Sequence, residues 1–388
     1  MAVRVFTVAE RRARLGRRHF LAGPGASVDE VTAALVGLHA TDPTTPYLSL
    51  WARLPGFERD DLSTALYDDR RLVRQVAMRR TLWMVPTGRL PAVQVAASNR
   101  VADTETGKLI ADVQKAGVAA DGSAWLDRAR RAVLRHLDAN GPTGAADLRL
   151  ALPELAGTWD PAPGKPWGGQ TSLAPRVLTV LDVRGDIMRG HNQGGWTSSR
   201  PLWCSATTWI GEVPNAEPDA AAADMVRNWL RTFGPATVAD ITWWFGHTLG
   251  WVRRALVDIG AVEVDLHGSP GVVLPDDLGI DPPPPQPWVA LLPGLDVTTM
   301  GWTGRDWYLN DLRAQVFDTR GNAGPTAWVD GRVVGGWRQT EDARVEVQVI
   351  ADIGRDARKA LQHNADRLTE WLDGARIKPR FPSPLTKA

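Results

Sequence analysis

Apolar and polar residues recur along part of this chain first with the spacing of helices and then with the spacing of strands. Gly234 to Phe245 and Leu249 to Leu256 have apolar residues three and four positions apart, as in helices buried on one face. Gly260 is placed to end the second helix, and Val262 to Leu266 alternates with the two-residue period of a half-buried strand. The order helix, turn, helix, strand, loop and strand predicts a winged helix over residues 218–280.

An internal repeat extends this interpretation upstream. Gly141 to Leu148 matches Gly234 to Ile241 at Gly, Pro, Ala and Asp, at an offset of 93 residues (141 to 234). Leu173 to Leu181 then has the pattern of a helix, and Ile187 to Gly190 that of a short strand. A second winged helix is therefore expected over residues 121–214.

The front of the chain fits the same order by pattern only. Val28 to Val36 is amphipathic, Asp60 to Asp68 begins with an acidic turn, and Leu82 to Pro86 is typical of a strand that a proline ends. We expect a first winged helix here, within residues 1–120 and behind a basic N-terminal arm.

The last part of the chain has a different pattern. Beyond the prolines of Asp281 to Pro287, Val289 to Leu292 reads as a buried strand. Ala327 to Val334 reads as a hairpin, because Asp330-Gly331 is the dipeptide that two-residue hairpin loops favour. The sequence thus predicts a helix-rich α+β chain, with winged helices at 1–120, 121–214 and 218–280, a linker at 215–218, and a C-terminal α/β domain at 287–388 whose hairpin lies near 327–337.

Length and composition change this picture little. The 388 residues suffice for several domains, and 44% hydrophobic with 23% charged residues is typical of a globular protein. Cys204 is the single cysteine, so no disulfide forms within the chain, which suits a reducing cytoplasm. We expect a cytoplasmic protein without a signal peptide or a membrane span, because no apolar run approaches ~18 residues.

The charge is distributed unevenly. The formal net charge is +1, but residues 1–135 carry 21 basic and 14 acidic side chains, a balance of +7. The other 253 residues carry 24 and 30, a balance of −6. Arginine outnumbers lysine by 39 to 6, and its planar guanidinium suits bidentate contacts with phosphate. A GC-rich genome enriches arginine as well, so composition leaves both explanations open.

Most familiar catalytic motifs are missing. The sequence has no glycine-rich phosphate loop, no G-x-G-x-x-G, no H-E-x-x-H and no G-x-S-x-G, and one cysteine cannot build a thiolate zinc site. We therefore expect neither a nucleotide cofactor nor a metal. The remaining candidates are His39, Thr41 and Asp42, where the pattern places the end of an apolar helix before two prolines. These side chains either form a catalytic cluster or cap the helix and its turn.

Five ordered motifs resemble those of the winged-helix DNA glycosylases of the AlkZ/YcaQ type, between about residues 28 and 340. The motifs are Gly37 to Pro43, Tyr47 to Arg53, Met78 to Pro86, Leu291 to Asp296 followed by Trp302 and Arg305, and Trp328 to Trp337. The resemblance implies tandem winged helices around a DNA-binding channel. It also implies removal of alkylated purines, which in some members includes unhooking the cross-links made by genotoxic natural products.

The catalytic triplet of that family, Gln-x-Gln or Gln-x-Asp, aligns with His39-Ala40-Thr41, so both functional side chains differ here. An N7- or N3-alkylated purine is already cationic and leaves with little help from a general acid. The protein must mainly stabilise a sugar cation and place a water. A neutral histidine at position 39 can accept a proton from that water, and the Thr41 hydroxyl can orient it. Asp42 either supplies negative charge or serves the turn at Pro43.

Arginines supply the expected DNA contacts, which set affinity and salt dependence rather than sequence preference. The candidates within or beside the motifs are Arg53, Arg79, Arg80, Arg305 and Arg332, the last beside the hairpin turn and placed to enter a minor groove. A second set forms the N-terminal arm and comprises Arg11, Arg12, Arg14, Arg17 and Arg18. The alternative for Arg79 and Arg80 is that they lie on the solvent-exposed edge of a helix or strand. Arg305 can instead brace a domain interface, together with Asp296 and Trp302.

The sequence therefore predicts a monomeric DNA glycosylase that acts on alkylated purines in double-stranded DNA, in repair or in self-resistance to a genotoxin. The alternative is a non-catalytic winged-helix DNA-binding protein, either a lesion binder or a transcription regulator. A regulator would be expected to dimerise on a palindrome. A winged-helix scaffold that binds protein is a third hypothesis, which an acidic channel would favour.

Overall fold

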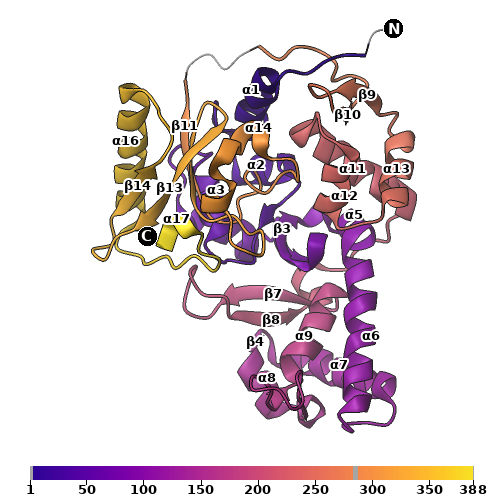
Figure 1. Ribbon diagram of the computed structural model, residues 1–388. Coiled ribbons are helices and arrows are strands. Elements are labelled where there is room, and N and C mark those ends of the chain that lie inside the picture. Colours follow the sequence, from indigo (N-terminus) through magenta and orange to yellow (C-terminus); the bar gives the residue numbers. More distant parts are fainter. Residues whose placement is uncertain (1–2, 283–286, 388) are drawn as a thin grey trace. The chain divides into compact units, whose positions relative to one another are not determined.

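The chain divides into two compact units in the computed structural model, which describes residues 3–282 and 287–387 (Figure 1). Unit 1 comprises Met1–Ser63, Met84–Pro86 and Ala222–Ala388, and unit 2 comprises Thr64–Trp83 and Thr87–Ala221. Both units take residues from the predicted domain 1–120, and the four-part division stays a prediction. The prolines at 283–286 of the predicted second linker lie outside the described residues.

Unit 2 has a helical core with small antiparallel sheets beside it. Its helices are α5 (Leu90–Val93), α6 (Asn99–Lys115), α7 (Gly122–Asn140), α8 (Ala145–Ala151), α9 (Ala174–Val183) and α10 (Ala206–Ile210), with π-helical turns at Thr64–Asp68 and Gln94–Ser98. Its strands are β2 (Leu72–Val76), β4 (Thr143–Gly144), β5 (Thr158–Trp159), β6 (Thr171–Ser172), β7 (Ile187–Asn192) and β8 (Pro201–Ser205), and β3 (Leu82–Pro86) begins in this unit. Leu109, Val133 and Val177 from the three long helices are fully buried against one another.

Unit 1 contains the N- and C-terminal elements. Its helices are α1 (Val8–Arg18), α2 (Val28–Ala34), α3 (Thr45–Trp51), α4 (Arg59–Ser63), α11 (Pro218–Phe233, from Ala222), α12 (Val238–Phe245), α13 (Leu249–Asp258), α14 (Asp306–Leu309), α15 (Arg313–Val316), α16 (Arg355–Leu372) and α17 (Pro384–Lys387). Its strands are β1 (Leu38–His39), β9 (Val262–Asp265), β10 (Pro270–Val273), β11 (Val289–Leu292), β12 (Thr326–Val329), β13 (Arg332–Gln339) and β14 (Val345–Val349). The last four form an antiparallel sheet in chain order, with α16 packed on it.

The internal repeat is visible in both hydrogen bonding and helix positions. Helix α8 begins at Ala145 and α12 begins at Val238, which keeps the offset of 93 residues (145 to 238). Just before each helix, one residue pairs with the second strand of the hairpin that follows. Thr143 pairs with Trp203 in β8, and Ala236 pairs with Val272 in β10. The predicted order of helices and hairpin is therefore present twice.

The hairpin predicted near 327–337 is also present. Asp330 and Gly331, between β12 and β13, have φ angles of 46° and 78°, as a two-residue loop of the primed type requires. Asp330 exchanges hydrogen bonds with Trp288, and a side chain at Gly331 would lie 2.6 Å from Cβ of Arg12. The turn is thus packed against α1.

Aromatic side chains fill the core of unit 1. Trp229 stacks on Phe233 with ring centroids 5.1 Å apart, and Trp244 and Trp302 lie 4.8 and 5.4 Å from the same Phe233 ring. The indole of Trp302 donates a hydrogen bond to the carbonyl of Phe233 at 3.1 Å. This cluster fixes α11, α12 and the segment that precedes α14 to one another. Over the described part of the chain, no helix is both long and apolar enough to cross a membrane.

Replacing Gly331 by alanine is expected to lower the free energy of unfolding by at least about 1–2 kcal/mol, the cost of a left-handed non-glycine residue, because the added methyl also meets Arg12. Urea denaturation measures this loss. Gly250→Ala, in α13 where a Cβ has open space, is the control and should leave stability unchanged or slightly raised. Equal effects of the two variants would contradict the prediction.

Candidate active site

The candidate triplet follows a sharp reversal of the chain after α2. Val36 and Gly37 have φ angles of 62° and 118°, and the backbone then extends into β1. A left-handed conformation is costly for a β-branched residue such as Val36, and such strain persists only where the surrounding structure enforces it. His39 lies on β1, so the prediction that it ends a helix was wrong. The sequence did not indicate this short strand, because two residues give no periodicity.

The side chains of the triplet differ in exposure. His39 is 4% exposed and Ala40 is buried, while Thr41 is half-buried. An extended backbone has a side-chain period of two, which is the spacing between His39 and Thr41. A histidine, a hydroxyl and a nearby backbone carbonyl are suited to holding a water and moving one of its protons.

Asp42 makes the turn that follows the triplet. Its Oδ1 accepts hydrogen bonds from the backbone N–H of Thr44 at 2.9 Å and from the Thr44 hydroxyl at 2.7 Å. Its Oδ2 accepts the backbone N–H of Arg380 at 3.0 Å. The first contact is the aspartate turn in which a carboxylate bonds to its own backbone two residues on. Of the two roles considered for Asp42, the structure shows the turn.

Helix α3 attaches the triplet to the segment that follows β11. The Thr45 hydroxyl donates to the carbonyl of Gly294 at 2.8 Å, and the Ser49 hydroxyl donates to Oδ2 of Asp296 at 2.6 Å. Three of the motifs recognised in the sequence, those at 37–43, 47–53 and 291–296, are therefore brought together in unit 1.

A buried ion pair is the centre of this junction. Arg53 donates from Nη1 and Nη2 to the two carboxylate oxygens of Asp296, at 2.9 and 2.8 Å. Arg53 also donates to the carbonyls of His19 and Ser49 and to the Thr298 hydroxyl. Both side chains of the pair are 0% exposed. The expectation that Arg53 contacts DNA is therefore corrected, because its donors are used inside the protein.

The charge on Asp296 is stabilised despite its burial. Burial by itself would raise the pKa of this carboxyl. The Arg53 guanidinium and hydrogen bonds from Arg53, Ser49 and the Thr298 backbone outweigh burial, so the pKa of Asp296 is lowered from its ordinary value. The carboxylate is thus ionised over the physiological range.

His19, at the end of α1, was not identified from the sequence and belongs to the same network. Its ring is fully buried, with Nδ1 2.7 Å from the Thr298 hydroxyl and its plane stacked 5.7 Å from Trp302. Burial, with the nearby charge of Arg53, lowers the pKa of His19 to about 3, although Asp296 opposes the shift. The ring is therefore neutral and structural. Its position between a hydroxyl and aromatic rings had no signal in the local sequence.

Arg305 is not placed to contact DNA either. It is 4% exposed, and its guanidinium lies 5.0 Å from the ring centre of Trp243 and 4.4 Å from that of Phe317. Burial lowers the pKa of Arg305. Of the two roles considered for Arg305, the structural one matches this placement, although the contacts are with the aromatic rings of Trp243 and Phe317. Arg332, at the start of β13, is half-buried beside the packed hairpin turn.

Arg79 and Arg80 lie in unit 2, between β2 and β3. Both have left-handed backbones, with φ of 55° and 61°. The guanidinium of Arg79 lies 5.9 Å from the ring centre of Trp83. Arg80 is more open, with 57% of its side chain exposed, and it forms an ion pair with Glu105 at 2.7 Å.

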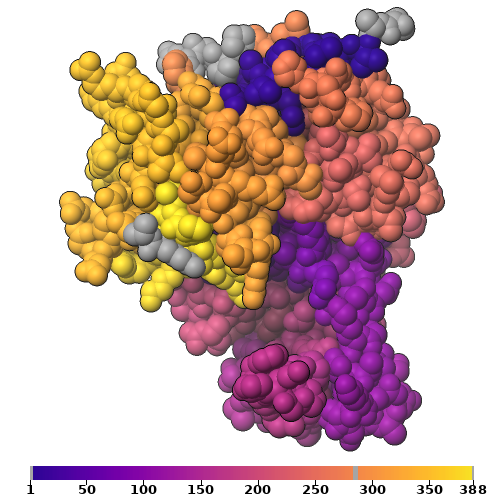
Figure 2. Space-filling model, in the orientation of Figure 1, coloured from indigo at the N-terminus to yellow at the C-terminus, as the bar shows by residue number. Residues whose placement is uncertain are grey.

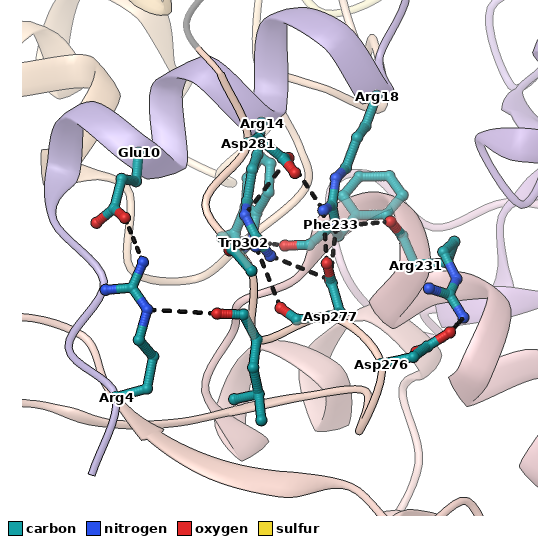
Figure 3. Close-up of polar contacts among 12 residues, drawn as sticks. Arg4, Glu10, Arg14, Arg18, Arg231, Phe233, Asp276, Asp277, Asp281 and Trp302 are labelled. Atoms are coloured by element: carbon teal, nitrogen blue, oxygen red, sulfur yellow. Dashed lines mark hydrogen bonds and ion pairs between the residues drawn. The ribbon is translucent and has the colours of Figure 1, made fainter. Parts of the chain in front are cut away.

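The predicted basic arm is a helix whose arginines serve the fold (Figure 3). Arg14 and Arg18 on α1 form ion pairs with Asp277 at 3.0 and 2.7 Å, and Arg18 also pairs with Asp281 at 3.1 Å. Arg11 lies over the ring of Trp307, and Arg12 donates to the carbonyl of the same residue at 2.8 Å. Four of the five arginines are thus committed to contacts within unit 1, so the expectation of a free arm is corrected.

A metal ion in a protein is usually held by three or more side chains that converge on one point. In residues 3–282 and 287–387, no three or more His, Cys, Asp or Glu side chains converge as metal ligands would. Cys204 in β8 is buried, and burial raises the pKa of its thiol to about 11.

Replacing Asp296 by asparagine is expected to cost about 3–5 kcal/mol of unfolding free energy at pH 7, because Arg53 remains buried without its counter-charge. The lowered pKa of Asp296 stabilises the fold above the unfolded-state pKa of about 3.9, and this stability is lost as the pH falls through the folded-state pKa. The difference between wild type and variant in urea denaturation should therefore shrink in acid. A difference below about 1 kcal/mol at pH 7 would count against the role of the pair.

Stability should also depend on the titration of His19. The unfolded state takes up a proton near pH 6.5, whereas the folded state takes it up only near pH 3. Between these values each pH unit downward should cost the wild type about 1.4 kcal/mol relative to a variant that cannot titrate. His19→Asn keeps a polar atom near Thr298 and provides that comparison. Parallel curves of stability against pH for the two proteins would show that the shift is absent.

Comparison with known proteins agrees with the motifs. The family model described as DNA glycosylase AlkZ-like matches residues 32–371. A curated protein of Streptomyces sahachiroi, described as an interstrand DNA cross-link repair glycosylase, is 29% identical over 214 residues, 53% of this chain. That match spans 57% of the relative's own length.

A solved structure has the same fold over almost the whole length of this chain. The DNA glycosylase AlkZ of Streptomyces sahachiroi superimposes with a TM-score of 0.72 and 22% identity, covering 95% of this chain and 97% of the other. The helix-rich α+β fold is therefore the fold of that structure. Since the family model spans most of the residues, including the triplet and both partners of the buried ion pair, this chain belongs to the AlkZ-like DNA glycosylase family.

Proposed function

We propose that this protein is a DNA glycosylase that hydrolyses the N-glycosidic bond of N7- or N3-alkylated purines in duplex DNA. The observation that carries the proposal is the family match over residues 32–371. His39-Ala40-Thr41 lies within this span and is the triplet that we propose as catalytic. Helix α3, which follows this position, is joined to the segment after β11 by two hydrogen bonds, and the Arg53 that follows it is joined to the same segment by a buried ion pair. A site held this firmly is suited to place a water and a sugar precisely.

Three winged helices around a DNA-binding channel are the finer architecture that we propose. The segments 121–214 and 218–280 support it, because each has the same order of helices and hairpin with the same strand pairing. Residues 1–120 would supply the third copy. Arg79, Arg80 and Arg332 remain proposed DNA contacts, and the exposure of Arg80 supports its part in this role.

The chemistry we propose follows from the charge of the substrate. An alkylated purine carries a positive charge and leaves as a neutral base, so the developing charge moves to the sugar. Neutral His39 accepts a proton from the attacking water, and the Thr41 hydroxyl orients that water. Asp42 acts as a positioning residue that fixes the turn after Thr41. Neither a metal nor a nucleotide is required for these steps.

Incubation with duplex DNA that contains N7-methylguanine is expected to release the base and leave abasic sites. His39→Ala should lower the single-turnover rate about 100-fold or more, the usual contribution of a general base. Thr41→Ala should lower it by a smaller factor. His363→Ala, at an exposed position of α16, is the matched control and should retain the wild-type rate.

Two other outcomes separate the alternatives. Binding of the duplex by wild type without base release would favour a lesion binder or a regulator. This alternative is motivated by the replacement of both functional side chains of the family triplet. Unchanged rates in His39→Ala and Thr41→Ala would instead place the chemistry elsewhere. Because the curated relative is described as repairing interstrand cross-links, a duplex with an N7-linked interstrand cross-link belongs in the same assay.

A further inference from the structure

The segment after α16 is a basic stretch that the function described so far does not use. Residues 374–388 contain four basic side chains and no acidic one: Arg376, Lys378, Arg380 and Lys387. The family match ends at residue 371, so the family motifs do not include this segment. The net charge of residues 136–388 does not reveal this basic segment, because the same part of the chain contains 30 acidic residues.

Hydrogen bonds and packing hold this segment on both sides of Arg380. Before it, the Arg376 guanidinium donates to the carbonyl of Thr340 at 2.6 Å, and the backbone of Ile377 donates to Oε1 of Gln339 at 2.8 Å. After it, Ser383 is fully buried, and its Oγ lies only 2.4 Å from where a Cβ on Gly324 would be. The position of Arg380 in unit 1 is therefore set by the fold.

Arg380 lies directly beside the candidate triplet. Its backbone N–H donates to Oδ2 of Asp42 at 3.0 Å, and its Nη1 donates to the carbonyl of Thr41 at 3.1 Å. The residue is nevertheless exposed, and Figure 2 shows the C-terminal residues, in yellow, at the molecular surface. The guanidinium thus combines a fixed position at the site with access from solvent.

Within residues 3–282 and 287–387, the charge of Arg380 is not neutralised by an ion pair. Asp42 accepts the backbone N–H of Arg380, whereas the guanidinium contacts the neutral carbonyl of Thr41. Among the described residues, no carboxylate forms a salt bridge with Arg380, in contrast to Arg14, Arg18 and Arg53. One bond to Thr41 leaves most of the five guanidinium N–H donors for another acceptor, and a phosphate matches their geometry.

We propose that Arg380, with the exposed Lys378 two positions before it in the chain, binds a phosphate of the DNA backbone next to the nucleotide that is excised. This inference rests on the proposed function, because it requires DNA to reach the His39 site. Arg380 then links the phosphate to the carbonyl of Thr41, so that binding of the backbone and alignment of the triplet occur together. The C-terminal segment is in this way a part of the DNA interface.

The test measures binding of the full chain to a duplex that contains a tetrahydrofuran abasic analogue, across a series of salt concentrations. Arg380→Gln should weaken binding about 5- to 10-fold at low salt and reduce the slope of log affinity against log salt by about 1, the loss of one phosphate contact. Arg380→Lys should keep most of the slope. Arg358→Gln, an exposed position on α16 with the same change of charge, should behave as wild type.

A purely structural role for Arg380 gives a different pattern. Arg380→Gln would then lower the rate of base release at saturating DNA while the salt slope stayed at the wild-type value, and this result would overturn the proposal. Wild-type binding without base release would contradict the glycosylase function, yet the slope would still decide whether Arg380 contacts phosphate. No binding of the duplex by wild type would overturn both.

Discussion

The pair of Arg53 and Asp296 is the interaction on which the candidate site depends. The motif segments 47–53 and 291–296 meet at it. Asp296 also accepts hydrogen bonds from the Ser49 hydroxyl and the Thr298 backbone, and Arg53 also donates to the Thr298 hydroxyl and the His19 carbonyl, so neither charge lacks partners. Such a pair adds little net stability compared with an apolar pair of the same size. Removal of one member is strongly destabilising, however, because it leaves the other charge buried without a counter-charge. The pair therefore specifies one arrangement of α3 against the segment after β11. That arrangement places His39, Thr41 and the turn at Asp42.

The sequence predicted local structure well where periodicity or turn chemistry was strong. Strands Leu82–Pro86 and Val289–Leu292 have the predicted bounds, and the Asp330-Gly331 turn forms the hairpin it indicated. The repeated Gly-Pro segments correctly placed the starts of two helices. Helices such as α16 were not identified, although their residues are amphipathic. The strand at His39 was missed because its extended backbone depends on the reversal at Val36, which only the surrounding core enforces.

Charged residues were the least predictable part of the site. Counting arginines showed that the front third is basic, but it did not show which arginines have partners far away in the sequence. Arg14 meets Asp277 across 263 residues and Arg53 meets Asp296 across 243. Conversely, Arg380 lies in a part of the chain with a negative balance and reaches the triplet across 339 residues. Net charge by region therefore indicated a polyanionic partner without locating its contact residues.

The division of unit 1 has a consequence for how the protein is made. The N-terminal 63 residues of unit 1 are synthesised before any part of unit 2. The ribosome then adds 243 residues after Arg53 before its partner Asp296 is in the chain. At about 5–20 residues per second, that interval lasts roughly 10–50 s. Unit 2, whose parts lie closer together in the chain, can complete its core first. The nascent candidate-site segment thus passes through a period in which Arg53 is still hydrated, and its buried ion pair can form only after Asp296 has been synthesised.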